Sequence, residues 1–196
     1  MPMRWLLIVI PWLIAILIIR SRRRSIVALK TQRKHFRNLA EQLHLHFQSD
    51  EYFVQLEGEW NGLNVVILPH QFEGPGAITL IYVESKMPSS DRNWIEPNVS
   101  LGRALVEKNY GYEISGTALS AEKIVPDLKN APYPYVAVTP PTRFIYSPLL
   151  QQILSNWKNF VVLIALNEGR QPSSSSIRKA LATAELIAVK IAGAES

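Results

Sequence analysis

The four histidines, at positions 35, 44, 46 and 70, are the side chains best suited to acid–base or metal chemistry. His44 and His46 are two residues apart, which on a helix points them about 200° apart. They share a metal only if the helix has ended before them, so we assign them polar or capping roles. His70 and Glu73 precede a Gly-Pro-Gly turn, and such a pair has the chemistry of a metal site or of an acid and a base. We interpret both as surface loop residues, with a hydrolase-type site as the alternative.

Residues 120–123 read Ser-Ala-Glu-Lys, which matches the Ser-x-x-Lys pattern of penicillin-binding enzymes. Neither a Ser-Asp-Asn nor a Lys-Thr-Gly triplet follows in order, so we interpret Ser120 as a helix N-cap. Phosphate-binding glycine patterns are absent, and the chain has no cysteine for a disulfide, a thiolate metal site or a nucleophile. The sequence therefore predicts no catalytic residue, no cofactor and no metal site.

The segment 133–146 combines aromatic side chains with prolines and one arginine. Tyrosine and arginine are enriched at the energetic centres of protein interfaces, and paired prolines stiffen a hairpin tip. We predict that a protein partner docks on Tyr133, Tyr135, Arg143, Phe144 and Tyr146. The alternative is a sheet edge that proline protects, with its aromatic residues facing the core.

Residues 3–19 are apolar except for Arg4, and a basic cluster follows them. Seventeen helical residues extend roughly 26 Å, close to the 30 Å or so of a bilayer core. Trp5 suits a membrane interface, and membrane helices tolerate a proline such as Pro11. A cleaved signal peptide is the rival interpretation, but no small-x-small cleavage site follows. A buried core helix would have to bury the arginines at its end. We therefore predict a transmembrane anchor over residues 1–24.

The positive charge of the chain is concentrated beside this anchor. Residues 1–37 carry nine basic side chains and no acid, whereas residues 38–196 carry twelve basic and sixteen acidic side chains. This asymmetry predicts an inner (plasma) membrane protein with its N-terminus outside and its domain in the cytoplasm. The domain has no basic surplus for a nucleic acid. We predict that anionic lipid head groups contact residues 20–37, in particular Arg20, Arg22, Arg23, Arg24, Lys30, Arg33 and Lys34.

The remaining chain is long enough for one domain with a substantial core. Apolar residues at three- and four-residue spacing predict an amphipathic juxtamembrane helix over residues 25–47. Residues 48–196 then form a globular domain, with strands expected over 52–57, 63–68, 77–83, 110–116, 135–139, 142–146 and 160–166. Helices are expected over 100–109, 120–130, 147–157 and 177–192, and residues 87–97 as a loop. This order predicts an α+β fold with a mixed, mostly antiparallel sheet.

The order of segments resembles a class of bacterial single-pass membrane proteins. In that class a basic helix leads into a Leu-Ala and Leu stripe and then into a strand with a Leu-x-Gly-x-aromatic-x-Gly step. Residues 39–43 and 56–62 carry the resemblance here. It covers a short part of the chain and implies a membrane-anchored layout without implying an activity.

Three functional hypotheses follow from these patterns. The first is a membrane-anchored interaction or assembly protein that catalyses no reaction. The second is a membrane-tethered hydrolase that uses polar residues around His70, Glu73 or Ser120. The third is a sensor of anionic lipid surfaces that uses residues 20–37 and responds to lipid charge and salt.

Overall fold

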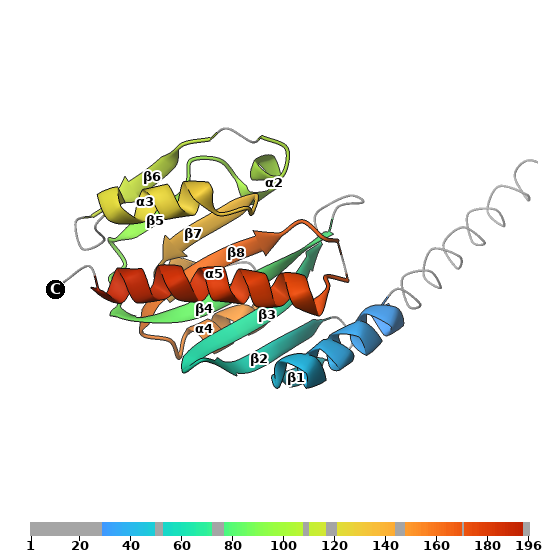
Figure 1. Cartoon of the computed structure of the whole chain (residues 1–196). Coiled ribbons are helices and arrows are strands. Elements are labelled where there is room, and N and C mark those ends of the chain that lie inside the picture. The colour runs from blue at the N-terminus through green and yellow to red at the C-terminus, as the bar shows by residue number, and fades with distance from the viewer. Residues whose placement is uncertain are drawn as a thin grey trace, which may run out of the picture.

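The computed structural model of this chain describes residues 29–49, 53–71, 77–107, 110–116, 121–143, 148–169 and 171–193. These residues form an α+β fold in which helices pack on one sheet, as predicted (Figure 1). The sheet is antiparallel in every strand pair, whereas the sequence predicts a mixed, mostly antiparallel sheet. The strand order is β1-β2-β3-β4-β8-β7-β5-β6. The predicted anchor lies outside the described residues. Among those that the structure does describe, no helix has both the length and the hydropathy needed to cross a membrane.

The eight strands pair antiparallel throughout. Their bounds are β1 His46–Ser49, β2 Val54–Trp60, β3 Leu63–Gln71, β4 Ala77–Pro88, β5 Trp94–Pro97, β6 Tyr112–Ser115, β7 Tyr135–Thr139 and β8 Asn159–Leu166. The predicted meander is confirmed in β2, β3 and β4. Asn61 and Gly62 both have positive φ angles, 51° and 79°, as a two-residue hairpin loop requires. This local geometry sets the register in which Trp60 pairs with Leu63.

Strand β8 lies between β4 and β7 near the middle of the sheet. It is an unbroken apolar run, and its side chains alternate between two separate clusters of buried residues. Phe160 and Val162 belong to one cluster, whereas Val161 and Leu163 belong to the other. The predicted strand buried on both faces is confirmed, because a strand covered by helices on each side has no polar face.

Three helices cover one face of the sheet: the N-terminal helix over residues 29–43, α3 (Ala121–Asn130) and α5 (Ser174–Ala192) (Figure 1). The N-terminal helix buries Phe36, Leu39, Ala40 and Leu43, which follow the predicted three- and four-residue spacing. His35 Nε2 lies 2.8 Å from the carbonyl oxygen of Pro172, just before α5. The helix that the sequence predicts as juxtamembrane is therefore packed into the domain core over residues 29–43.

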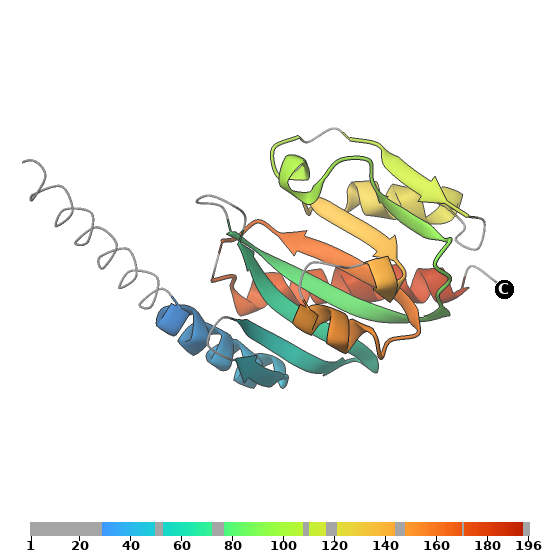
Figure 2. The same ribbon diagram turned by 180° about the vertical axis from the view of Figure 1, so that it is seen from behind.

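The opposite face carries shorter helices. These are α2 (Leu101–Ala104), α4 (Pro148–Leu154) and the 3₁₀ turn η1 (Pro141–Arg143) (Figure 2). Leu101, Leu150 and Leu154 bury against Tyr82, Leu163 and their neighbours. The short helices thus cover a cluster of buried residues separate from the one under α3 and α5.

Three local predictions are wrong. The N-terminal helix ends at residue 43, before the predicted residue 47, because His44 adopts a positive φ of 56° and the amide of Leu45 donates to the carbonyl of Ala40. Phe47 therefore lies in β1. Part of the expected loop 87–97 forms strand β5, and residues 141–143 form a 3₁₀ turn where the sequence predicts a strand from residue 142.

Candidate functional site

Two chain segments meet at the end of the sheet where β7 begins and β8 ends. One is the segment after α2, and the other is the Ala-Pro-Tyr-Pro connection over residues 131–134, between α3 and β7. The amide of Ala131 donates to the carbonyl of Asp127 at 3.0 Å as α3 ends. The two prolines then restrict φ in this connection, in which all four residues are bends. This geometry places Tyr133 beside tyrosines that come from the other segment.

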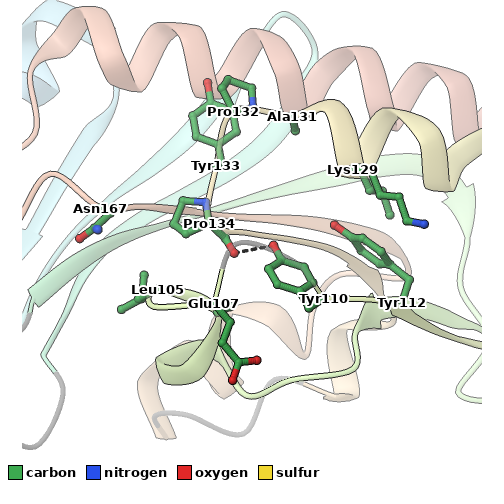
Figure 3. Close-up of a pocket in the computed structure, with 12 residues that line it drawn as sticks. Leu105, Glu107, Tyr110, Tyr112, Lys129, Ala131, Pro132, Tyr133, Pro134 and Asn167 are labelled. Atoms are coloured by element: carbon green, nitrogen blue, oxygen red, sulfur yellow. Dashed lines mark hydrogen bonds between the residues drawn. The ribbon is translucent and has the colours of Figure 1, made fainter.

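A cavity of about 790 Å³ lies between these segments, and we name it the tyrosine pocket (Figure 3). This volume falls within the range of about 300–1,000 Å³ that is usual for ligand sites. Its lining residues are Ala104, Leu105, Glu107, Tyr110, Tyr112, Leu128, Lys129, Ala131, Pro132, Tyr133, Pro134 and Asn167. The site thus combines three phenol rings with a cation, a carboxylate and an amide.

Internal contacts hold the tyrosine rings in place. The hydroxyl of Tyr110 donates to the carbonyl oxygen of Pro134 at 2.5 Å, which joins the two segments directly (Figure 3). The rings of Tyr110 and Tyr112 are inclined at 54°, with their centroids 6.0 Å apart. This separation is typical of favourable aromatic pairs. These contacts fix the positions of Tyr110 and Tyr112 in the pocket wall.

Burial raises the pKa of Tyr112, and the neighbouring Tyr110 raises it further. Burial also raises the pKa of Tyr110, although its interaction with Tyr112 opposes this change. Both phenols are therefore neutral at physiological pH. They offer hydroxyl groups and ring faces to a ligand, and neither is an activated base.

The rim of the tyrosine pocket carries opposite charges. Lys129 is exposed on α3, whereas Glu107 accepts a hydrogen bond from Arg103 Nε at 2.5 Å. Val106, next to Glu107, is 82% exposed. The tyrosine pocket therefore offers tyrosine side chains, a residue type enriched at the energetic centres of protein interfaces, with a cation and a carboxylate at its edge.

A second, more polar cavity of about 440 Å³ lies on the face that α2 covers. We name it the His70 cavity. It is lined by His70, Glu96, Pro97, Asn98, Val99, Ser100, Leu101, Gly102 and Tyr135. Burial lowers the pKa of His70, which keeps its imidazole neutral near pH 7. Its neighbours in the cavity come from the end of β5, the start of α2, the segment between them and the first residue of β7.

The structure divides the predicted docking residues. Tyr133 lines the tyrosine pocket, whereas Tyr135 is buried and lines the His70 cavity. Phe144 and Tyr146 lie outside the described residues. The sequence interpretation missed Tyr110 and Tyr112, although Tyr-Gly-Tyr was visible as an aromatic pair in the segment predicted as a strand.

Arg143 makes its contacts within the domain. Its guanidinium carbon lies 3.7 Å from the ring centroid of Trp94, and its Nη2 donates to Glu96 Oε1 at 2.5 Å. The adjacent Thr142 hydroxyl donates to Asp91 at 2.7 Å. The bond to Glu96 is the main cause that raises the pKa of Arg143. The arginine thus joins η1 to β5, and only part of its side chain faces solvent.

The predicted lipid-contacting residues are divided by the limits of the described chain. Lys30 and Lys34 are exposed on the N-terminal helix, and Arg33 between them is half-buried. Arg20, Arg22, Arg23 and Arg24 lie outside the described residues. Exposed cations on a helix whose other side is core are compatible with contact to an anionic surface.

The residues of the hydrolase hypothesis are also only partly described, because Glu73 and Ser120 lie outside the described ranges. His44 and His46 both follow the end of the helix. Within the described part of the chain, no three His, Asp or Glu side chains lie close enough together to hold a metal ion. Comparison of the chain with protein-family models, curated proteins and solved structures gives no match.

Proposed function

We propose that this chain is a single-pass protein of the cell inner (plasma) membrane that binds a protein partner and catalyses no reaction. Its N-terminus lies outside, and its α+β domain lies on the cytoplasmic side. The observation that carries the proposal is the tyrosine pocket, which presents Tyr110, Tyr112 and Tyr133 together with exposed Lys129. Tyrosine supplies a large contact area at a low cost in conformational entropy, which favours a binding role.

The N-terminal helix supports the membrane part of the proposal. It begins at residue 29, shortly after the predicted anchor over residues 1–24, and its apolar residues pack into the core through Phe36, Leu39 and Leu43. A domain joined in this way keeps a defined distance from the anchor, because no long linker intervenes between helix and sheet. Lys30 and Lys34 on its exposed side favour a position near anionic head groups.

Protease protection tests the topology. Trypsin added to inverted vesicles should digest the domain, whereas trypsin added to right-side-out vesicles should leave it intact. Digestion from the outer side only would refute the cytoplasmic position.

Site-specific photo-crosslinking in intact cells tests the docking role. A photoreactive residue in place of Lys129, on the rim of the tyrosine pocket, should give one discrete crosslinked protein. The matched control replaces Gln152, which is exposed on α4 of the opposite layer. Absence of a product at residue 129, or the same product at both positions, would contradict a partner at the pocket.

A hydrolase is the second proposal, and the environment of His70 favours it. A neutral imidazole in a polar cavity with Glu96 and Ser100 has the protonation state that a general base requires. If the chain is a hydrolase of this kind, His70→Ala should abolish the cellular function while the protein remains folded and in the membrane. Full function of the His70→Ala variant would remove the case for this residue as a base.

A further inference from the structure

The three helices on one face of the sheet concentrate positive charge. The N-terminal helix, α3 and α5 together carry nine lysines and arginines and four carboxylates. The other described residues carry five basic and eight acidic side chains. The described domain is thus electrically polarised, with its positive side on the layer that faces the viewer in Figure 1. Such a distribution orients a protein in the field of a charged surface.

Aliphatic side chains are exposed on the same layer. Leu186 is 73% exposed and Val189 is 61% exposed, and they lie three residues apart on α5. Ala182, four residues before Leu186, is also exposed and extends the same stripe. The inner side of α5 is already occupied by the sheet through Ile177, Leu181 and Ile187. The outer stripe is therefore not required for the core.

Some charges on this layer have partners within the domain. Lys190 forms an ion pair with Asp127 of α3, and Asn61 donates to Glu185 at 2.9 Å. Arg178 donates to the carbonyl of Gln42, which joins α5 to the end of the N-terminal helix. Lys179 is exposed on α5, as Lys30 and Lys34 are on the N-terminal helix. These three exposed lysines belong to the same layer of helices as the aliphatic stripe.

We propose that the outer face of α5, together with the N-terminal helix, lies on an anionic lipid bilayer with Leu186 and Val189 at the boundary of head groups and acyl chains. Exposed aliphatic side chains with cations around them match the interfacial zone of such a bilayer. A nucleic acid would pair with the lysines but would leave the aliphatic stripe in water, which favours the bilayer. This inference rests on the proposed membrane function. It adds a second membrane contact, which fixes the orientation of the domain relative to the bilayer.

In this orientation the layer with α2 and α4 faces away from the bilayer. The tyrosine pocket lies at the end of the sheet and is lined from both layers, by Ala104 of α2 and Lys129 of α3, apart from the outer face of α5. The anchor restrains the position of the domain along the membrane normal, and the α5 face restrains the rotation of the domain about the anchor. The two contacts are physically separate and can be removed independently.

The chain has no cysteine, so one introduced cysteine carries a single fluorescent label. Full-length chain with Ala182→Cys reports on the α5 face, and Gln152→Cys on α4 is the matched control. The labelled proteins are reconstituted into phosphatidylcholine vesicles with and without phosphatidylglycerol. Only the label at residue 182, and only with phosphatidylglycerol, should shift its emission to shorter wavelength and lose quenching by aqueous iodide.

A Leu186→Ser/Val189→Ser variant should abolish this shift, whereas Val106→Ser, at an equally exposed aliphatic residue, should leave it unchanged. Lys30→Glu/Lys34→Glu/Lys179→Glu should also abolish it, and 1 M salt should weaken it because the Debye length falls to about 3 Å. Retention of these variants in carbonate-washed membranes tests the anchor separately. The orientation is refuted if the shift is absent, if it is equal in neutral lipid, or if a duplex oligonucleotide protects residue 182 and vesicles do not.

Discussion

Asn64 Nδ2 donates a hydrogen bond to Glu84 Oε2 at 2.7 Å, across the pair of strands β3 and β4. The other carboxylate oxygen of Glu84 accepts from the amides of Lys158 and Asn159, at 3.0 and 3.3 Å. Glu84 is buried, so these bonds replace the water that an exposed carboxylate would bind. One side chain thus joins two strands to the entry of β8.

Glu84→Ala should lower the free energy of unfolding by about 2 kcal/mol, because two backbone amides lose their acceptor. Glu84→Gln should cost about 1 kcal/mol or less, because the Asn64 amide can rotate and present its oxygen to the new amide group. Denaturant unfolding of the detergent-solubilised chain, followed by tryptophan fluorescence, measures both. Equal losses for the two variants would show that hydrogen bonding of the carboxylate is not the cause.

The tyrosine pocket should make stability depend on pH in alkaline solution. Burial raises the pKa of Tyr112 above its ordinary value, so the folded state holds the proton more tightly than the unfolded state. The protonated Tyr112 therefore contributes to the free energy of unfolding in full below about pH 10. This contribution is lost as the pH rises through the folded-state pKa of Tyr112. Ultraviolet titration of tyrosinate should show a late phase that shrinks in Tyr112→Phe. A titration that is unchanged by this substitution would contradict the assignment.

Arg143→Lys should lower the free energy of unfolding by about 1 kcal/mol, since lysine loses the planar contact with Trp94 and the paired bonds to Glu96. The side chain of Arg143 is 35% exposed, which limits the loss through solvent screening. Chemical denaturation measures this free energy. Lys123→Arg, at an exposed residue of α3, is the control for replacing one of these two residue types by the other. If Arg143→Lys leaves the free energy of unfolding unchanged, the contacts of Arg143 do not stabilise the fold, and the arginine can serve a partner instead.

His44→Gly should raise the free energy of unfolding by up to about 1 kcal/mol. His44 has a φ of 56° at the end of the N-terminal helix, a conformation in which glycine avoids the steric cost of a Cβ. His44→Val should lower stability, because a β-branched residue is poorly suited to positive φ. Thermal and denaturant unfolding of the wild-type protein and the two variants measures their stabilities. We expect stability to increase from the valine variant to the histidine of the wild type and then to the glycine variant. Any other order would show that the histidine side chain makes a contact of its own.

Local patterns were sufficient for much of the fold. The unbroken apolar run of β8, the Asn-Gly hairpin loop and the apolar stripe of α5 each identify an element within a short window of sequence. The absence of cysteine and the charge asymmetry are also properties of the sequence alone. These features depend on neighbouring residues, and so they can be recognised without knowing the rest of the chain.

The sites could not be recognised in this way. Strand β5 is four residues long, and it becomes a strand because Ile95 pairs with Val138 of β7 and with Ile114 of β6. Trp94 contacts Arg143 from 49 positions away, and Tyr110 bonds to Pro134 across 24 positions. The tyrosine pocket and the positive helical face exist only after the sheet has brought separate segments together. The sequence determined which residues favour a helix or a strand. The tertiary structure decided which of these residues share a surface, because that depends on pairing between distant strands.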